Sequence, residues 1–304
     1  MPDSIGQYQI LEDRTASGGP IRARDLHAGR TVLIRRIDRA RASDAALAAA
    51  RTATTISHPN VASVYELAED ASGLYIVTEF VAGDSLDKVL GGRPMNPRRA
   101  LEVAAQLADG LAEVHSLGLV HGDISLSTVA ITPKDQVKLF DVGVPVAAIG
   151  QPAPSGSSFA RSLAPEQALG LPTDARTDLF SLGAVLYTMF VGEPPFGPAT
   201  TTDASGAVLQ GTFVPPTKKN PSLPPALDRI LERALSRSVA TRYQSAAELA
   251  ADLRQVSEAA EARAAAAPPR AVRSRPARSR GAVLTVLLAV AVVLAAAAWW
   301  FLSR

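Results

Sequence analysis

Residues 120–143 constrain the fold of this chain most, because two short apolar runs there each end in an aspartate placed in a turn. The first run leads to Asp123, and the second, at 137–140, leads to Asp141. A Pro-Lys-Asp break at 133–135 separates them and indicates a tight hairpin. Two carboxylates at the mouths of neighbouring strands could hold a divalent metal, or one could act as a base beside it. They could equally be turn aspartates that cap strands, and these residues alone leave both interpretations open.

Charge is distributed unevenly along the 304 residues, although the net charge is only +2. Residues 1–262 carry 24 basic and 29 acidic side chains, a net of −5, and the remaining residues carry +7. The basic character therefore belongs to the tail, which argues against nucleic-acid binding by the globular part. The chain has no cysteine, so disulfides and thiolate metal sites are excluded and a reducing compartment is the simplest fit.

Two segments with different compositions follow the globular part. Residues 262–280 are rich in Ala, Pro and Arg and contain no acid, which predicts a disordered juxtamembrane linker. Residues 281–302 contain no charge and end in Trp-Trp-Phe-Leu, which predicts a single transmembrane helix with 303–304 as an external tail. The alternative is a buried apolar helix. Arginines before the span indicate, by the positive-inside rule, a single-pass protein of the inner (cytoplasmic) membrane with its domain in the cytoplasm.

The expected secondary structure divides into a β-rich part and a helical part. Strands are expected at 8–11, 21–25, 31–35, 61–67 and 74–80, together with a helix at 43–56 that Ser43 caps. Further helices are expected at 85–90, 97–117, 179–190, 227–235 and 245–260. A small β-rich lobe followed by a larger helical lobe is an α+β pattern with a cleft between the lobes. The boundaries place these lobes at residues 1–82 and 83–261.

Several longer motifs follow one another in the helical part. They are His-Gly-Asp at 121–123, Asp-Val-Gly at 141–143, Ala-Pro-Glu-Gln-Ala at 164–168, Asp-Ala-Arg-Thr-Asp-Leu-Phe-Ser-Leu-Gly at 174–183, Gly-Glu-Pro-Pro-Phe at 192–196 and Arg-Tyr at 242–243. In this order and spacing the chain resembles the bacterial eukaryotic-like (Hanks-type) Ser/Thr protein kinases over about residues 8–256. The resemblance implies a two-lobed protein kinase fold and ATP-dependent transfer of a phosphoryl group to protein hydroxyls.

The resemblance also assigns roles to residues that this chain retains. Asp123 stands at the position of the catalytic base, and Asp141 at that of a metal ligand. Glu166 and Arg242 stand where the family has a partly buried, bidentate ion pair that fixes the lower lobe. Asp178 would either cap its helix or hold the backbone amides of the catalytic loop.

Other positions that carry the chemistry in the family hold different residues here. Arg35 stands for the lysine on the third strand, which would lie against the phosphates, and an arginine is not a conservative replacement for it. The glutamate that should pair with this lysine falls at Ala49. In the catalytic loop Gly122 replaces an arginine, Ser125 replaces a lysine, and Thr128 replaces the metal-binding asparagine with a weaker ligand.

The features expected to bind a nucleotide are reduced. The glycine-rich turn retains only Gly18 and Gly19, which also fit an ordinary hairpin turn. The hinge at Thr78, Glu79 and Val81 would still offer backbone groups to an adenine. We therefore expect binding of ATP and Mg²⁺ to be weak or absent.

These observations lead to three hypotheses. The first is a membrane-anchored pseudokinase that regulates or binds other proteins, such as a true kinase or its substrates. The second is an atypical but active Ser/Thr kinase that uses Arg35, Asp123 and Asp141 with one metal ion. The third is a structural membrane adaptor without a nucleotide site. Loss of several charge-stabilising groups favours the first, since removing even one such group commonly lowers a rate by about two to three orders of magnitude.

Overall fold

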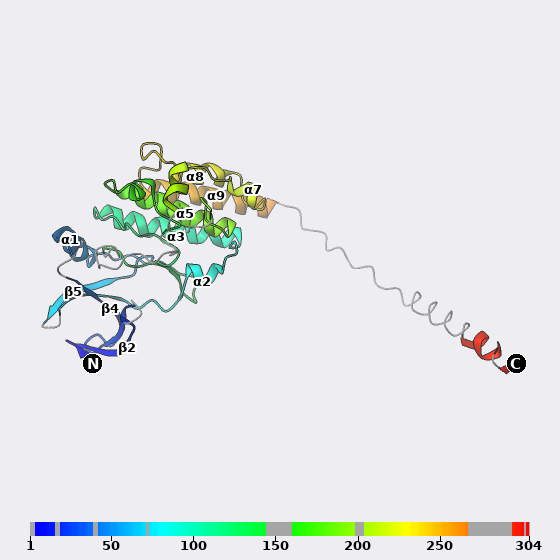
Figure 1. Cartoon of the computed structure of the whole chain (residues 1–304), viewed down its shortest axis with the longest axis horizontal. Helices are drawn as coiled ribbons and strands as arrows, with labels where there is room; N and C mark the ends of the chain where they lie inside the picture. Colours follow the sequence, from blue (N-terminus) through cyan, green and yellow to red (C-terminus); the bar gives the residue numbers. More distant parts are fainter. Residues whose placement is uncertain are drawn as a thin grey trace. The chain divides into compact units, whose positions relative to one another are not determined.

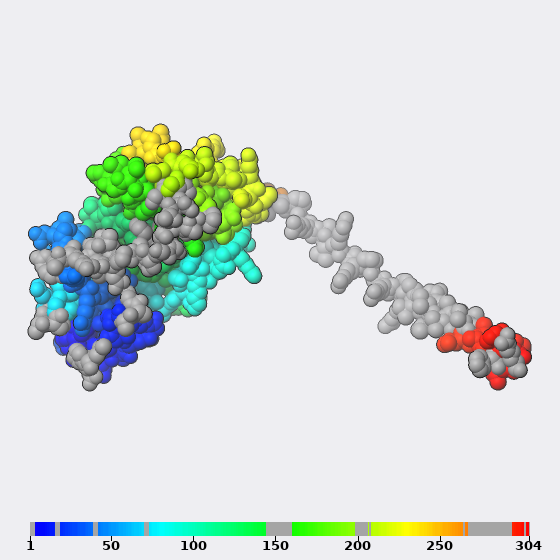
Figure 2. All heavy atoms as spheres, in the orientation of Figure 1, coloured from blue at the N-terminus to red at the C-terminus, as the bar shows by residue number. Residues whose placement is uncertain are grey.

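The computed structural model describes residues 4–15, 19–38, 42–70, 73–143, 160–197, 204–266, 294–300 and 302–303. The chain divides into two units, Met1–Ala262 and Arg263–Arg304. The first unit has a β-rich lobe followed by a helical lobe, which confirms the α+β architecture expected from the sequence (Figure 1). In the space-filling view, the blue atoms of the β-rich lobe and the green and yellow atoms of the helical lobe form opposite sides of this unit (Figure 2).

The β-rich lobe is built on an antiparallel six-stranded sheet with the order β1-β2-β3-β4-β6-β5. Its strands are β1 (Ser4–Ile5), β2 (Tyr8–Asp13), β3 (Ile21–Asp25), β4 (Thr31–Ile37), β5 (Val64–Asp70) and β6 (Gly73–Glu79). Helix α1 (Asp44–Ala53) connects β4 to β5, and Ser43 caps it, as expected, by accepting a hydrogen bond from the amide of Ala46.

Alternation along β4 decides which side chains face the helical lobe. Val32 and Ile34 are buried in a cluster that covers one face of the sheet. Because successive side chains of a strand point to opposite faces, Leu33 and Arg35 lie on the other face. Leu33 pairs with Arg22 of β3 and with Thr78 of β6 on either side.

The helical lobe surrounds a central helix, α5, that is buried along most of its length. Its helices are α2 (Leu86–Leu90), α3 (Pro97–Ser116), α4 (Pro165–Ala168), α5 (Ala175–Val191), α6 (Ala204–Gln210), α7 (Pro216–Lys219), α8 (Ala226–Ala234) and α9 (Ala246–Ala266). Every residue of α5 from Thr177 to Phe190 is buried, which confirms the buried helix expected at 179–190. Asp174 caps the start of α5, and Gly192, at φ 91°, ends it in the left-handed conformation that glycine favours.

A second, smaller sheet lies within residues 83–261. Its order is β7-β8-β9, with β7 (Asp84–Ser85), β8 (Val129–Ile131) and β9 (Val137–Leu139). The pairing of β8 with β9 confirms the expected hairpin. The strand expected at 61–67 begins instead at Val64, because Val61 makes an isolated parallel bridge to Leu139 and the segment before β5 is thereby drawn onto the hairpin.

The C-terminal expectations are only partly covered by the described residues. Helix α9 continues to Ala266, so the first five residues of the linker expected at 262–280 are helical. The reason is local: residues 262–266 are four alanines and one arginine, all strong helix formers. Residues 267–293, which include most of the expected span at 281–302, lie outside the described residues, and 294–300 are helical. Within the described part of the chain, no helix has both the length and the apolar character needed to cross a membrane.

Candidate active site

The loop that carries Asp123 is held in place by hydrogen bonds to the central helix α5. Asp178 of α5 accepts hydrogen bonds from the amides of His121 and Gly122, both at 2.8 Å, and its carboxylate also lies 2.8 Å from Nε2 of His115. Gly122 adopts φ 74° there, a conformation that glycine takes without strain. Of the two roles left open for Asp178, the structure therefore shows the second, because the capping role belongs to Asp174.

Asp123 is a buried acid with incomplete hydrogen bonding. Its side chain is part of a residue that is only 8% exposed, and Oδ1 has no hydrogen-bond partner among the described residues. Burial raises the pKa of its carboxyl group to about 6, and the nearby charge of Asp141 acts in the same direction, while His121 and Arg35 oppose it. A carboxyl group with a pKa near neutrality in a cleft has the properties of a general base, although burial alone can produce the same pKa.

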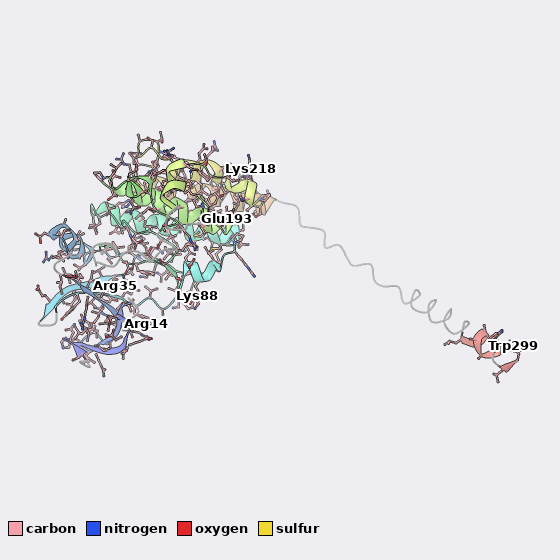
Figure 3. The ribbon with its side chains drawn as sticks, in the orientation of Figure 1. Arg14, Arg35, Lys88, Glu193, Lys218 and Trp299 are labelled. Atoms are coloured by element: carbon pink, nitrogen blue, oxygen red, sulfur yellow. The ribbon has the colours of Figure 1, made fainter. Side chains whose placement is uncertain are left out.

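Asp141 lies in the turn that follows β9, and it is paired with the arginine of β4. Nη2 of Arg35 is 2.8 Å from Oδ2 of Asp141, and the two side chains are 22% and 10% exposed. Asp141 adopts φ 69°, in the left-handed region that aspartate tolerates better than most residues. Figure 3 labels Arg35 within the β-rich lobe. The ion pair therefore links the sheet of one lobe to the hairpin of the other.

Helix α1 packs directly against this turn but contributes no acid to it. A Cβ atom added to Gly143 would lie 2.7 Å from Cβ of Ala53 and 3.0 Å from the carbonyl oxygen of Ala49. Ala49, the position where the sequence analysis expects the missing glutamate, therefore lies beside the turn. The only acid of α1 is Asp44 in its first turn, at the far end of the helix from Ala53.

The hydroxyl of Thr128 is turned toward the backbone of the catalytic loop. It can donate to the carbonyl oxygen of Asp123 at 2.9 Å or to that of Ser125 at 3.1 Å. It also accepts a hydrogen bond from the amide of Ser125 at 2.9 Å. Ser125 is itself fully buried, and its hydroxyl lies 2.9 Å from that of Ser127. Thr128 thus stabilises the loop, and its predicted role as a metal ligand stays a prediction that this geometry does not favour.

The hinge residues join the lobes through an additional ion pair. The carboxylate of Glu79 accepts from the amide of Ser63 at 3.0 Å and pairs with Nζ of Lys138 at 3.1 Å. This contact was not foreseen, because Lys138 lies in an apolar strand far along the sequence. The carbonyl oxygen of Val81 accepts from the amide of Gly83 at 3.0 Å, and Thr78 lies on β6 beside Leu33.

The turn between β2 and β3 differs from the glycine-rich, phosphate-binding turn of the family. Gly18 lies outside the described residues, and the amide of Gly19 donates to the carbonyl oxygen of Arg14 at 2.9 Å, closing a local turn. The guanidinium of Arg22 lies 4.5 Å from the centre of the Phe80 ring in the hinge, a cation–π contact. Arg22 was not recognised from the sequence, where it reads as one more charged residue of a strand.

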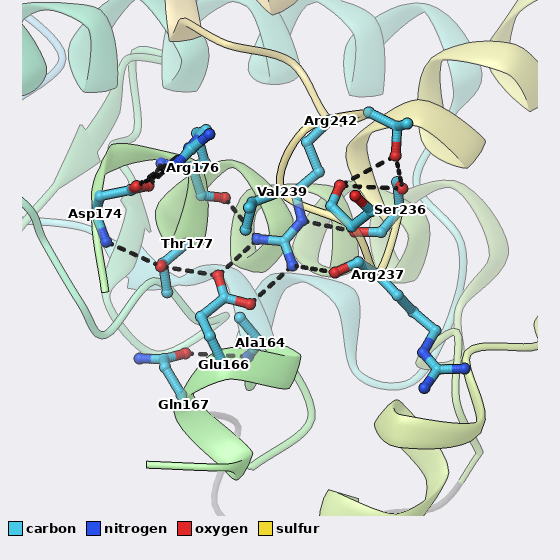
Figure 4. A network of polar contacts seen from close by, with 12 residues as sticks. Ala164, Glu166, Gln167, Asp174, Arg176, Thr177, Ser236, Arg237, Val239 and Arg242 are labelled. Carbon is cyan, nitrogen blue, oxygen red and sulfur yellow. Dashed lines mark hydrogen bonds and ion pairs between the residues drawn. The ribbon is translucent and has the colours of Figure 1, made fainter. Parts of the chain in front are cut away.

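The pair between Glu166 and Arg242 forms the centre of a polar network in the helical lobe (Figure 4). Nη1 and Nη2 of Arg242 bind the two carboxylate oxygens of Glu166 at 2.6 and 2.8 Å, in the bidentate geometry expected from the sequence. Thr177 donates to the same carboxylate at 2.8 Å. Ser236, Arg176 and Arg237 offer their carbonyl oxygens to the guanidinium, which lies 4.8 Å from the Phe180 ring centre.

One further contact connects this network to the catalytic loop. Nε2 of Gln167 donates to the carbonyl oxygen of Gly122 at 2.8 Å, while its Oε1 accepts from the amide of Ala164 at 3.0 Å. Gln167 belongs to the Ala-Pro-Glu-Gln-Ala motif, so the sequence contained the signal without showing the role. The frame around Asp123 is therefore tied both to α4 and to α5.

Comparison with known proteins agrees with this architecture. Residues 16–253 match the family model of the protein kinase domain. The chain is 36% identical over 255 residues to the serine/threonine-protein kinase PknB of Mycolicibacterium smegmatis, which covers 78% of this chain and 40% of that protein. It is 36% identical over 253 residues to PknB of Mycobacterium tuberculosis, covering 77% and 40%. A probable serine/threonine-protein kinase of Streptomyces coelicolor is 32% identical over 269 residues, covering 82% and 39%.

The chain thus spans about two fifths of the length of these relatives. The family model nevertheless covers both lobes and every motif described above. Protein kinases use ATP with Mg²⁺ and act on protein substrates. The chain belongs to the protein kinase family, within its bacterial Hanks-type serine/threonine branch.

Proposed function

We propose that this protein is a catalytically impaired kinase, a pseudokinase, that acts as a regulatory or binding module in cytoplasmic signalling. The observation that carries the proposal is the ion pair of Arg35 with Asp141 at 2.8 Å. In an active kinase the lysine at the position of Arg35 pairs with a glutamate of the next helix, and the aspartate at the position of Asp141 holds Mg²⁺. Here the charges of Arg35 and Asp141 neutralise each other, and Ala49 offers no carboxylate to pair with Arg35.

The donor set of the cleft supports loss of the metal site. Mg²⁺ requires near-octahedral oxygen ligands at about 2.0–2.1 Å, usually including one or two carboxylates. One oxygen of Asp141 is bound to Arg35, and the hydroxyl of Thr128 faces the loop backbone. These residues do not fit Mg²⁺ in the arrangement described. Binding of ATP with Mg²⁺ is therefore weak or absent. The backbone of the hinge at Glu79 and Val81 would still be the segment that binds an adenine.

An active, atypical Ser/Thr kinase is the second candidate. A specific observation favours it, because one carboxylate oxygen of Asp123 has no hydrogen-bond partner among the described residues and the group has a pKa of about 6, both suitable for a base. The charge-stabilising groups that should act with this base, at Ser125 and Thr128, are nevertheless replaced by hydroxyls that bind within the loop. A structural adaptor without any nucleotide site is the third, and it requires only the fold.

Membrane attachment is a separate part of the proposal, and it rests on the sequence. Residues 281–302 contain no charge and follow five arginines between Arg270 and Arg280. A helix of this length would measure about 33 Å, close to the hydrocarbon thickness of a bilayer of about 30 Å. The arginines would lie at the anionic cytoplasmic surface, adding about 1 kcal/mol of attraction each. The partners would then be proteins at that surface, such as a true kinase or its substrates.

Phosphoryl transfer tests the proposed loss of activity. The full-length chain, purified in mild detergent, is incubated with ATP labelled at the γ-phosphate, Mg²⁺ or Mn²⁺, and a general protein substrate. We expect incorporation into itself and into the substrate to equal that of the matched Asp123→Asn variant. Transfer by the wild type that disappears in Asp123→Asn would establish the atypical kinase instead.

Thermal stability with nucleotide distinguishes a pseudokinase from an adaptor. A ligand that binds only the folded state stabilises it by mass action, so bound ATP raises the melting temperature, and more so as its concentration increases. A shift with ATP would support a retained nucleotide site. The absence of a shift at millimolar ATP would favour the adaptor.

Fractionation of cells tests the anchor. We expect the full-length chain to resist extraction from membranes with alkaline carbonate, and a chain that ends at residue 262 to be recovered in the soluble fraction. Protease added outside intact spheroplasts should leave the kinase domain uncut. Degradation of the domain there would show the opposite orientation.

A further inference from the structure

The aspartates of the cleft are the place where the family holds its metal, and in this chain a side-chain cation lies there. We infer that the guanidinium of Arg35 replaces the divalent cation, so that the closed arrangement of the cleft is held by an internal charge and excludes Mg²⁺. This inference deepens the proposed function and rests on it. According to this inference, the side chain of Arg35 is what prevents metal binding beside Asp141.

The first argument is electrostatic. A metal ion at the Oδ2 atom of Asp141 would lie close to Nη2 of Arg35, which is 2.8 Å from the same oxygen. Two cations that share one carboxylate oxygen repel each other, and this repulsion is strong where water is partly excluded. The pair is mostly shielded from solvent, with 22% of Arg35 and 10% of Asp141 exposed. A metal that binds this oxygen must therefore displace the guanidinium.

The second argument concerns the remaining ligands. The described residues contain no group of three or more histidine, aspartate or glutamate side chains arranged to hold a metal ion. Thr128 uses its hydroxyl within the loop, between the carbonyl oxygen of Asp123 and the amide of Ser125. Removal of Arg35 would leave the carboxylates of Asp141 and Asp123 without the guanidinium that now lies beside them. Two such carboxylates, with water, are what a Mn²⁺ ion requires for weak binding.

The third argument is the choice of arginine. A guanidinium is planar, stays charged in every accessible environment, and is less strongly hydrated than an ammonium group, so it suits a partly buried ion pair better than lysine does. It also reaches from β4 in one lobe to the turn after β9 in the other. Helix α1 packs on the same turn, with Ala53 against Gly143. One side chain thus connects the sheet to a turn on which three elements converge.

Binding of Mn²⁺ alone to the full-length chain tests the inference, with the loss of the free-ion signal in electron paramagnetic resonance as the readout. The wild type should bind no Mn²⁺ at the cleft at millimolar concentration. Arg35→Met should gain one bound Mn²⁺, and its melting temperature, lower than that of the wild type, should rise when Mn²⁺ is added. The double variant Arg35→Met/Asp141→Asn should lose the gain. The matched control is Arg36→Met, which removes an exposed arginine from the next position of the same strand.

Two results would overturn the inference. One is Mn²⁺ bound by the wild type and lost in Asp141→Asn, which can be measured even if Arg35→Met does not fold. The other is a folded Arg35→Met variant that binds no more Mn²⁺ than Arg36→Met. Either result would remove the metal-site argument from the proposed function without deciding that function, because neither measures phosphoryl transfer. Conversely, Asp123-dependent transfer by the wild type would overturn the proposed function itself.

Discussion

Two arginine–carboxylate pairs in this domain show how differently the same chemistry can be used. Arg242 and Glu166 meet in bidentate geometry, and the guanidinium, which is fully buried, also donates to three carbonyl oxygens. Arg35 and Asp141 meet through one contact of 2.8 Å, in a partly exposed cleft. The adjacent Asp123 keeps an oxygen without a partner in the described part of the chain.

The difference distinguishes residues that stabilise the helical lobe from residues at the positions that carry out phosphoryl transfer in the family. A buried charge is tolerated only when its hydrogen-bonding groups are satisfied, and Arg242 meets that requirement within the helical lobe. The cleft pair balances charge at a place where the family needs a metal and a lysine. We conclude that the helical frame of a kinase is intact here, while the residues that would move a phosphoryl group have changed.

The largest effect is expected from breaking the frame pair. Arg242→Ala leaves Glu166 buried without its partner, which should lower the free energy of unfolding by about 3–5 kcal/mol. Thermal or denaturant unfolding measures this loss. The matched control is Arg176→Ala, which breaks an ion pair with Asp174 whose side chains are 32% and 51% exposed, and which should cost much less because exposed ion pairs are screened by solvent. Equal losses in the two variants would contradict the structural role of Arg242.

The turn of the cleft should be the next most sensitive feature. In Gly143→Ala the new Cβ would lie 2.7 Å from Cβ of Ala53, in a residue at φ 75°. Steric overlap and left-handed strain together should lower the free energy of unfolding by about 2–3 kcal/mol.

Gly122→Ala provides the control for that prediction. Gly122 has φ 74°, but no atom of the described residues lies within 4 Å of its added Cβ. Only the conformational strain remains, which should cost about 1–2 kcal/mol. If Gly143→Ala destabilises no more than Gly122→Ala, then α1 does not pack on the turn as described.

A smaller effect, of opposite sign, is expected at Asp123. Burial and Asp141 raise the pKa of its carboxyl group to about 6, against the pull of His121 and Arg35. A raised pKa in the folded state means that stability falls as pH rises from about 4 through about 6, because the buried group must then lose its proton. Asp123→Asn removes this penalty, so it should stabilise the protein by about 1–2 kcal/mol at pH 7.5.

The pH dependence makes the Asp123 prediction specific. At pH 4 the aspartate is largely protonated in the folded state, and the variant should have nearly the stability of the wild type. Unfolding curves at the two pH values measure the difference. A gain of the same size at both would assign the effect to packing instead of charge.

The sequence predicted the frame better than the cleft, for physical reasons. Glu166, Asp178 and Arg242 make contacts within one lobe, where motif spacing and helix position largely fix the geometry. The helix that carries Ala49 could be predicted because its Ala-rich sequence follows Ser43, which caps it. The start of α9 was close to prediction, whereas its extension to Ala266 was missed because the composition of the linker outweighed the helix propensity of its first residues.

The contacts between lobes could not be predicted in the same way. Arg35 and Asp141 are more than a hundred residues apart, and they meet only because the two lobes close on each other. The same holds for Glu79 with Lys138. Spacing along the chain showed which residues were absent from their family positions. Only the folded structure shows which side chain pairs with the aspartate that remains.

Restoring one residue tests most directly whether the lost chemistry is distributed over several positions on an intact frame. In Arg35→Lys the family's lysine returns, but Ala49 still provides no acid, and Ser125 and Thr128 still replace the lysine and asparagine of the catalytic loop. The measurement is the rate of γ-phosphate transfer from ATP by the full-length Arg35→Lys chain, beside Arg35→Lys/Asp123→Asn. The account predicts equal rates in the two variants. A large, Asp123-dependent gain from Arg35→Lys alone would contradict it.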